Sequence, residues 1–291
     1  MRCIKKPKLS VCPNKTTKYP PANTNPLDHI NAYSIKHSNG ILGISYDGYI
    51  VHKESKDITH FLILREYYTK CEIEKNLQQI IDEILCKNKL CKARISVANQ
   101  MGIPFSAFLI PEDYPSMNNE KSAYIIKDIS NCCDFTKSIF IKSDMNKFIN
   151  FIDDFRGGKY RKKAKGLNSA NTKFECFLAN NDGYTPFPGD LDGLLIYENK
   201  VLAILEFKTH NLNTPIENQY LGQYGKADWR RIEVLHNLKT KLDVPIYVIF
   251  WGTNHSKIKI DKVTKIGKIE ESKVVVWNDF VKTLLSMINI C

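Results

Sequence analysis

Residues 188–208 read Pro188-Gly189-Asp190-Leu191-Asp192-Gly193-Leu194-Leu195-Ile196-Tyr197-Glu198-Asn199-Lys200-Val201-Leu202-Ala203-Ile204-Leu205-Glu206-Phe207-Lys208. Two apolar runs of strand length flank the turn-forming residues 198–200, and this pattern predicts a β-hairpin with a three-residue loop. With Tyr197 facing Val201, Asp192 stands opposite Glu206 and Asp190 opposite Lys208. Because alternate residues of a strand share a face, we expect these four charged side chains on one side of the hairpin.

Two carboxylates that face each other across a hairpin need a cation between them. Directly opposed strand residues lie about 4.5–5.5 Å apart at Cβ, where like charges destabilise the pairing. Lys208 is one candidate partner. A divalent cation is the better candidate, because hard cations such as Mg²⁺ bind carboxylate oxygens together with water and phosphate. We therefore expect a Mg²⁺ site at Asp192 and Glu206, in which Mn²⁺ can substitute; the alternative is a hairpin-end ion network without catalysis.

An acidic residue followed, after a spacer, by Glu-x-Lys on a hairpin resembles the PD-(D/E)xK nuclease superfamily, and most of all its type II restriction endonucleases. The resemblance covers mainly residues 167–252. It departs from the family pattern because Gly189 separates Pro188 from Asp190. The form Gly-Asp-Leu-Asp-Gly is similar to members in which the second aspartate is the ligand, so the resemblance implies Asp192 as the main metal ligand and Asp190 as a secondary one.

The resemblance also implies roles for the residues of the Glu-x-Lys triplet. Glu206 and the backbone carbonyl of Phe207 would be further metal ligands, and Lys208 would position or activate the attacking water. One or two Mg²⁺ ions held in this way orient a phosphate and lower the pKa of a bound water.

Three residues outside the hairpin complete the implied catalytic set. A helical stretch is predicted from about residue 169 to 179, and Glu175 in it would support a metal or a water; an exposed helical glutamate is the alternative. A longer helix is predicted from Thr214 to about Lys241. Nucleases of this kind often place a polar residue of this helix near the substrate strand, which implies roles for Gln219 and Gln223.

The charge balance favours a polyanionic partner. The chain has 42 Lys and Arg against 31 Asp and Glu, a net charge of +11, and such an excess favours nucleic acid. Residues 156–166 carry cations and no anion just before the hairpin, and we expect DNA contacts from Lys159, Arg161, Lys162, Lys163 and Lys165. Residues 257–268 form a second lysine-rich segment, which is predicted as a loop. It could contact phosphates, and a solvated surface loop is an interpretation of at least equal weight.

The cysteines and the hydropathy bear on location. The 9 cysteines are an odd number without a Cys-x-x-Cys pair, so we expect free buried thiols and a reducing, cytoplasmic compartment. A zinc site with Cys86 and Cys91 is a weaker alternative. No apolar run approaches the length of about 18 residues that a membrane span needs.

The sequence predicts an α/β fold, α+β overall, in three regions. Residues 1–39 are expected as an N-terminal arm, 40–155 as an α+β recognition or assembly region, and 156–291 as a nuclease core with a mixed central sheet flanked by helices. The further predicted elements are strands on both sides of Asp47-Gly48 and at 61–64, 93–97, 104–110, 138–141, 245–251 and 273–277, and helices at 73–85, 145–155 and 279–288, the last capped by Asn278.

The sequence predicts a Mg²⁺-dependent DNA endonuclease that cuts double-stranded DNA at specific sites, as a homodimer if the sites are palindromic. A repair, recombination or viral nuclease, such as an exonuclease or a junction resolvase, is the alternative among enzymes. A catalytically inactive DNA-binding module with the same fold is the alternative from another class. An RNA nuclease is less favoured, because no basic segment interleaved with aromatics is visible.

Overall fold

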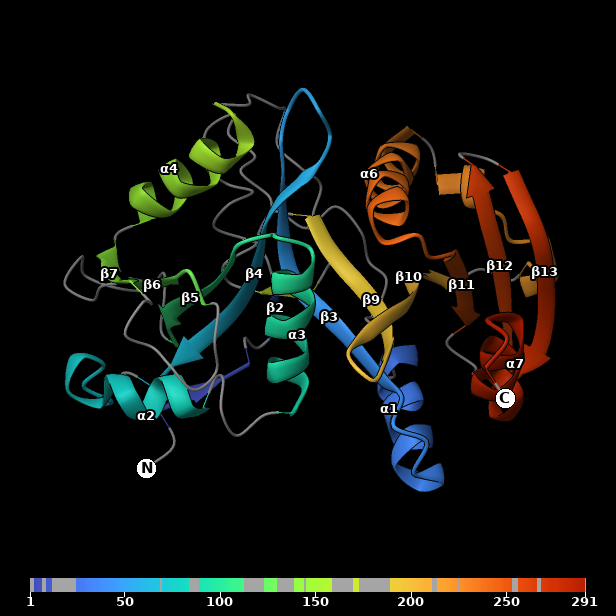
Figure 1. The fold of residues 1–291 in the computed structure, drawn as a ribbon, viewed down its shortest axis with the longest axis horizontal. Coiled ribbons are helices and arrows are strands. Elements are labelled where there is room, and N and C mark those ends of the chain that lie inside the picture. The colour runs from blue at the N-terminus through green and yellow to red at the C-terminus, as the bar shows by residue number, and fades with distance from the viewer. Residues whose placement is uncertain are drawn as a thin grey trace. The chain divides into compact units, whose positions relative to one another are not determined.

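The computed structural model describes residues 3–6, 9–11, 25–68, 70–83, 89–112, 123–129, 139–143, 145–158, 170–172, 189–210, 214–224, 226–252, 256–265 and 268–290. The chain divides into two compact units: the first unit comprises residues 1–21 and 46–190, and the second unit residues 22–45 and 191–291. Each unit is built on a mixed sheet with helices (Figure 1). The α+β prediction with a mixed sheet flanked by helices is therefore confirmed.

In the second unit the strands lie side by side in chain order. They are β9 (Gly189–Tyr197), β10 (Lys200–His210), β11 (Ile246–Gly252), β12 (Lys257–Lys265) and β13 (Lys268–Val276). The pair β10–β11 is parallel and the other neighbouring pairs are antiparallel. A parallel pair needs a crossover connection, and α6 (Lys226–Leu242) supplies it after the short 3₁₀ helices η3 (Ile216–Asn218) and η4 (Leu221–Tyr224).

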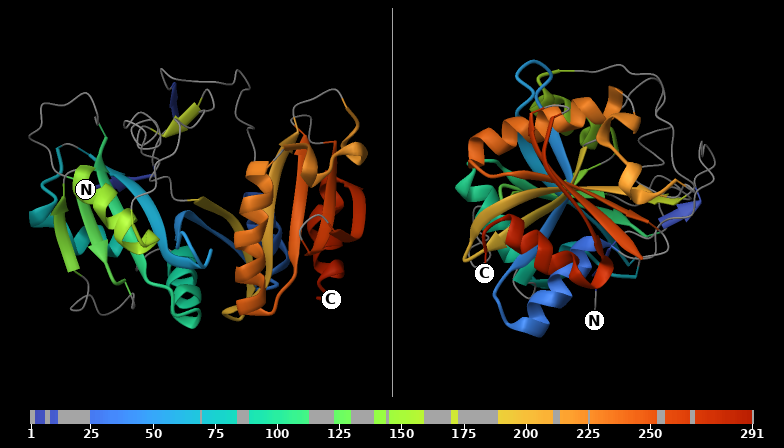
Figure 2. Two further views of the ribbon diagram at one scale, coloured as in Figure 1. Left: turned by 90° about the horizontal axis from the view of Figure 1, so that it is seen from above. Right: turned by 90° about the vertical axis from the view of Figure 1, so that its right-hand side faces the viewer.

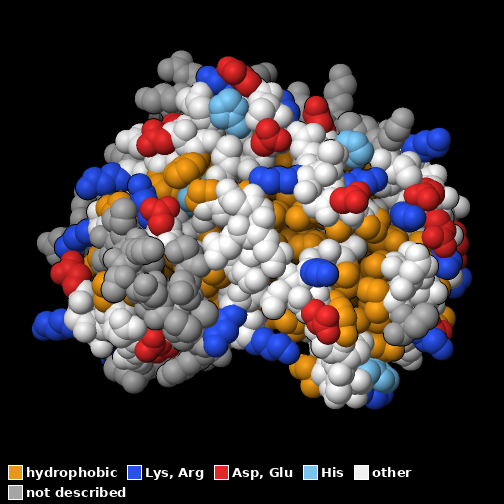
Figure 3. All heavy atoms as spheres, viewed as in Figure 1, with side chains coloured by type: hydrophobic (Ala, Val, Ile, Leu, Met, Phe, Trp, Pro, Cys, Tyr) orange, Lys and Arg blue, Asp and Glu red, His pale blue; other side chains and the backbone are white. Residues whose placement is uncertain are grey.

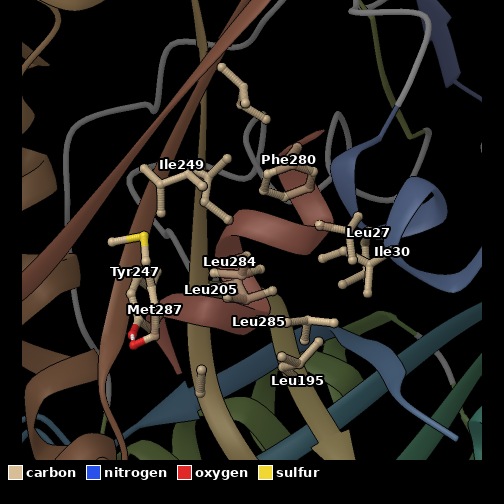
Figure 4. Close-up of a cluster of buried hydrophobic side chains, with 14 of the residues drawn as sticks. Leu27, Ile30, Leu195, Leu205, Tyr247, Ile249, Phe280, Leu284, Leu285 and Met287 are labelled. Atoms are coloured by element: carbon tan, nitrogen blue, oxygen red, sulfur yellow. Dashed lines mark hydrogen bonds between the residues drawn. The ribbon is translucent and has the colours of Figure 1, made fainter. Parts of the chain in front are cut away.

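The core of the second unit lies on one face of this sheet. Leu205, Tyr247 and Ile249 point from the strands toward α1 (Pro26–His37) and α7 (Phe280–Met287), which follows the 3₁₀ helix η5 (Trp277–Asp279) (Figure 4). Helix α6 lies on the opposite side of the strands from α1 and α7 (Figure 2, right). Each fully buried Leu, Ile or Phe contributes about 1.5–3 kcal/mol to the free energy of folding. The packing of α1 and α7 therefore stabilises the sheet that carries Glu206.

The first unit contains a second group of paired strands. Its strands are β3 (Leu42–Val51), β4 (Ile58–Tyr67), β5 (Phe105–Pro111), β6 (Ala123–Lys127) and β7 (Ile139–Ser143), with β1 (Ile4–Lys5) beside β4. The pair β4–β5 is parallel, and the other pairs are antiparallel. Its helices are η1 (Glu74–Asn76), α2 (Leu77–Ile81), α3 (Lys89–Gln100) and α4 (Met145–Arg156), and β2 (Leu9–Val11) pairs with β8 (Ala170–Thr172). Helix α4 buries Phe148 and Ile152 against Leu62 and Phe108.

Several predicted elements are confirmed. Strands lie at 61–64, 104–110, 138–141, 245–251 and 273–277, and helices at 145–155 and 279–288, within a few residues of the expected bounds. The predicted helix at 73–85 is present as η1 and α2 over its described part. The predicted arm, residues 1–39, includes α1, whose Leu27 and Ile30 are buried in the core of the second unit.

Three other predictions are wrong. The two short strands expected around Asp47-Gly48 are one strand, β3, because the Asp47 carboxylate accepts a hydrogen bond from the neighbouring strand instead of forming a turn. The strand expected at 93–97 lies in α3, and a short apolar run does not distinguish a strand from a buried helix. The lysine-rich loop expected at 257–268 lies mostly in β12, whose Ile258 and Ile260 alternate with lysines and face the core.

Three helix boundaries also differ from prediction. The helix expected from Thr214 begins at Lys226, and η3 and η4 precede it. Residues 170–172 of the predicted helix at 169–179 form strand β8. Asn278 does not cap α7, which follows η5 and has Asp279 at its N-cap.

The cysteine prediction is wrong in part. Cys3 and Cys71 form a disulfide in the first unit, and Cys91 is a buried free thiol. Cys86 lies outside the described residues, as do Cys12, Cys132, Cys133, Cys176 and Cys291. Pairing depends on which strands and loops meet, which cysteine spacing alone does not give. Among the described residues, no helix is long and apolar enough to span a membrane.

Candidate active site

The hairpin loop of β9 and β10 is shorter than predicted. Tyr197 pairs with Lys200, which leaves Glu198 and Asn199 as a two-residue loop. Both loop residues have positive φ, 48° and 64°, as the two central residues of a type I′ hairpin turn require. Sequence spacing alone missed this, because Lys200 is as acceptable in a turn as at the start of a strand.

A β-bulge restores the predicted register. The pairing shifts by one residue between Val201 and Ala203, so that beyond the bulge Leu205 stands opposite Gly193. The next residues outward are Asp192 and Glu206, which therefore face each other across the hairpin as the sequence predicts. A Cβ on Gly193 would lie 3.1 Å from the Cβ of Leu205, so the site depends on a glycine beside Asp192.

The two carboxylates share one guanidinium, that of Arg231 in α6. Its Nη2 lies 2.8 Å from Oδ1 of Asp192, and its Nε donates to Oε2 of Glu206 at 2.7 Å. The other oxygen of Asp192 accepts the backbone N–H of Phe207 at 2.8 Å. The other oxygen of Glu206 lies 2.9 Å from Nζ of Lys208. The side chain of Glu206 is 1% exposed, and taking a carboxylate out of water in this way is costly unless cationic groups lie beside it.

Arg231 is the member of this charged cluster that sequence reasoning missed. It lies 25 residues after Glu206, and nothing in the local pattern sets it apart from the adjacent Arg230. The available signal was indirect: a crossover helix between parallel strands covers one face of the sheet, so a cation in its first turns can reach a polar face of the hairpin.

The donor set fits a hard divalent cation on one condition. Asp192 and Glu206 approach one cationic group at 2.7–2.8 Å, so they lie close enough to share an ion, and carboxylate oxygens are the ligands that Mg²⁺ takes. Arg231 now lies between them, and an ion bound to both acids must displace it from at least one. Within the described ranges, no group of three or more Asp, Glu, His or Cys is placed to hold a metal.

The remaining hairpin candidates differ in position. Asp190 is exposed on β9, and Phe207 lies in the β10–β11 ladder opposite Ile249. The side chain of Phe207 packs toward the core, so only its backbone belongs to the polar face. Its N–H, rather than its carbonyl, makes the hydrogen bond described above.

Gln219 and Gln223 belong to the segment 214–224 rather than to a long helix. Gln219 is buried, its Nε2 donates to Oγ1 of Thr214 at 2.9 Å, and its Oε1 accepts a hydrogen bond from Gln223. The carbonyl oxygen of Gln219 accepts from Nζ of Lys259 at 2.5 Å. These contacts fasten the segment to β12, so they give Gln219 a structural role.

A second acid–lysine pair lies on the same sheet face. Lys259 stands opposite Phe250, which stands opposite Lys208, and directly opposed residues share a face. Nζ of Lys259 lies 3.4 Å from Oδ2 of Asp261. Burial raises the pKa of Asp261, although the Ser272 hydroxyl donates to it at 2.6 Å.

The expected DNA contacts lie outside the described residues. This holds for Lys159, Arg161, Lys162, Lys163 and Lys165, and also for Glu175. On the face drawn in Figure 3, basic and acidic side chains are interspersed over the described surface. The net charge of +11 is therefore not gathered into one continuous basic patch on that face.

No protein-family model matches the chain, and no curated protein matches it. Among solved structures, one titled "Crystal structure of Sex pheromone staph-cAM373 precursor" aligns over 86% of this chain and 89% of its own, with 9% identity and a TM-score of 0.18. A similarity of this size carries no argument about fold or function. The functional assignment therefore depends on the residues and geometry of the hairpin.

Proposed function

We propose that the protein is a Mg²⁺-dependent DNA endonuclease of the PD-(D/E)xK type that hydrolyses phosphodiester bonds. One observation carries the proposal: Asp192 and Glu206, on paired strands, both contact the guanidinium of Arg231, and Nζ of Lys208 lies 2.9 Å from Glu206. The antiparallel hairpin, crossover helix α6 and parallel strand β11 follow in the order that the resemblance implies. The net charge of +11 supports a polyanionic substrate.

The residues of the hairpin have distinct roles in this proposal. Asp192 and Glu206 would hold the divalent cation, which supplies Lewis-acid stabilisation and lowers the pKa of a bound water. Lys208 has a compact ammonium group that positions the attacking water or offsets charge on the phosphate. The hydrogen bond from Phe207 N–H fixes the Asp192 carboxylate, so the acid is oriented before a substrate arrives.

Arg231 has a second role in this proposal, which is to bind the substrate phosphate. When a cation takes the carboxylates, the guanidinium is released from at least one of them and can donate to a phosphate oxygen, a pairing for which its planar fork is suited. The cluster of two acids with Lys208 and Arg231 is already neutral. A divalent cation adds two positive charges, and an anionic phosphate offsets one of them, so we expect DNA to strengthen cation binding.

Plasmid cleavage tests the proposal. Purified full-length protein is incubated with supercoiled DNA and Mg²⁺ or Mn²⁺, and Asp192→Ala and Lys208→Ala are assayed in parallel with DNA binding in Ca²⁺. We expect the wild type to cut, both variants to lose cutting, and all three to bind in Ca²⁺. Discrete bands would identify a site-specific enzyme and a smear a non-specific nuclease. Full activity in both variants would refute the site.

A catalytically inactive DNA-binding module is the second candidate, and one observation favours it. The charges of Asp192, Glu206, Lys208 and Arg231 balance without any metal. In this alternative the cluster only stabilises the hairpin. Binding of DNA without cleavage in either Mg²⁺ or Mn²⁺ would support it.

A further inference from the structure

The two units share one order of elements. The first unit has the antiparallel pair β3–β4, helix α3, the parallel strand β5, then β6, β7 and α4. The second unit has β9–β10, α6, the parallel strand β11, then β12, β13 and α7. Few topologies are available to small α+β units, so equivalence requires a match of register as well as order.

The hairpin registers match residue by residue. Gly48 stands opposite Leu62 in the first unit, and Gly193 opposite Leu205 in the second. Each glycine directly follows an aspartate. Each hairpin also carries a bulge at the same place: Thr59 and Leu202, each three residues before the leucine, are skipped in the pairing.

The crossover to the parallel strand also matches. The N–H of Phe61 donates to the carbonyl of Pro104 at 2.9 Å, and the N–H of Ile204 donates to that of Pro245 at 2.9 Å. In each unit this proline directly precedes the parallel strand. Topology, strand register, bulge and a backbone hydrogen bond therefore agree independently.

The agreement extends to the aspartate of the candidate site. Oδ2 of Asp47 accepts the N–H of Leu64 at 2.8 Å, as Oδ2 of Asp192 accepts the N–H of Phe207 at 2.8 Å. Asp47 is thus the counterpart of Asp192. The residue before Leu64 is Ile63, which stands where Glu206 stands in the second unit.

The cations of the site have counterparts too. Arg65 takes the position of Lys208, and its Nη1 lies 2.8 Å from Oδ2 of Asp47. Arg94 lies on α3, the crossover helix of the first unit, as Arg231 lies on α6, the crossover helix of the second. Arg94 is buried and interacts electrostatically with Asp47. The first unit therefore retains the aspartate and both cationic positions.

The glutamate is the group that the first unit lacks. Ile63 is fully buried and has no atom that can coordinate a hard cation. Asp47 has the guanidinium of Arg65 at 2.8 Å and interacts with Arg94, and no second acid stands in the place of Glu206, so a divalent ion there would meet one carboxylate against two positive charges. The two units thus differ in one acid and in the replacement of a lysine by an arginine.

We infer that the first unit is a second copy of the same fold whose cation site has been lost with the glutamate, so that each chain holds one divalent-cation centre, in the second unit. This inference extends the proposed function. With one centre per chain, one chain breaks one DNA strand at a time.

Cation stoichiometry tests the inference without any cleavage assay. Mn²⁺ is titrated into the full-length protein without DNA, and free Mn²⁺ is followed by its electron paramagnetic resonance signal. We expect one tight Mn²⁺ per chain in the wild type, its loss in Asp192→Asn, and its retention in the matched variant Asp47→Asn. Two equivalent ions per chain, equal loss in both variants, or no ion in the wild type would overturn the inference.

A gain of binding provides the second test. The double substitution Ile63→Glu with Arg65→Lys, made in the Asp192→Asn background, restores the acid and the lysine to the first unit. We expect the folded double variant, checked by circular dichroism, to bind one Mn²⁺ where its parent binds none. A folded variant that binds none would refute the equivalence, and if it does not fold the wild-type stoichiometry decides. Protein that binds one Mn²⁺ through Asp192 but cuts no DNA would refute the proposed function and leave this inference standing.

Discussion

The two units place an aspartate in the same position but surround it differently. In the second unit Asp192 has Glu206 beside it, and Arg231 bridges the two acids at 2.8 and 2.7 Å. In the first unit Asp47 pairs with Arg65 at 2.8 Å, and Ile63 fills the place of the glutamate. The difference separates two roles. The aspartate–amide hydrogen bond occurs in both units and so belongs to the fold, whereas the glutamate occurs only in the second unit, where the proposed chemistry requires it.

The largest expected effect comes from copying the first unit into the second. We expect Glu206→Ile to reduce DNA cleavage at least about 10³-fold, because the cation loses one of two carboxylate ligands and with it several kcal/mol of charge stabilisation. The measurement is the rate of supercoiled plasmid loss in Mg²⁺. The matched control is Ile63→Val, which should cut at the wild-type rate; a similar loss in both variants would mean that the units are not functionally different.

The next effect concerns the arginine on each crossover helix. We expect Arg231→Met to lower the free energy of unfolding by about 3–5 kcal/mol, since the buried Glu206 loses a cation. The same change should raise Mn²⁺ affinity about tenfold by removing a competing cation. Urea denaturation and Mn²⁺ titration measure the two effects. Arg94→Met should destabilise the protein without changing Mn²⁺ affinity, and an unchanged affinity in Arg231→Met would show that the arginine does not compete with the ion.

The disulfide allows the stabilities of the two units to be separated. Cys3 and Cys71 both lie in the first unit, with a sequence separation of 68, and residues 22–45 of the loop that they close belong to the second unit. Because the bond itself joins two parts of the first unit, we expect Cys3→Ser to destabilise that unit by about 2–4 kcal/mol. All 3 tryptophans belong to the second unit. Circular dichroism should therefore show an earlier first transition while the tryptophan fluorescence transition stays in place. Equal shifts of both signals would mean that the units unfold together.

The smallest expected effect is acid sensitivity of the first unit. Burial, and next the charge of Lys127, lower the pKa of His60 to about 3. Below pH 6.5 the unfolded chain takes up a proton that the folded unit does not, so the free energy of unfolding decreases as the pH falls, by about 1.4 kcal/mol between pH 6 and pH 5. The counterpart of His60 in the second unit is Ala203.

The variant His60→Ala isolates this contribution. We expect it to flatten the dependence of the first transition on pH between 7 and 5, as measured by urea unfolding at each pH. Burial raises the pKa of Asp261, and the sign is then reversed: the folded second unit holds a proton that the unfolded chain releases as the pH rises. A slope that is unchanged in His60→Ala would assign the acid sensitivity to another group.

The hairpin could be predicted because local rules determine it. Charged residues alternate with apolar ones at 190–192 in one strand and at 205–208 in the other, so both acids are expected on one face once the register sets Asp192 opposite Glu206. The predicted loop was one residue too long, and the bulge between Val201 and Ala203 restored the same register. The outcome was therefore correct for the facing pair and wrong for the turn.

The other parts depended on long-range contacts. Arg231 reaches Glu206 across 25 residues, and only the path of α6 determines which of two adjacent arginines does so. The run at 93–97 satisfies both strand and helix patterns, and its place as a crossover between β4 and β5 decides for helix. The duplication was also hidden, because the equivalent residues share register and backbone hydrogen bonds but few side chains.

The hydrogen bond from the Leu64 amide to the Asp47 carboxylate has a consequence for finding relatives of this protein. It joins two neighbouring strands, and it is present in a unit that has no counterpart of Glu206. An Asp-Gly dipeptide in such a hairpin therefore indicates the fold and does not indicate an activity. A search that aims at activity should give the most weight to an acid directly opposite that aspartate, the position that Glu206 occupies in the second unit.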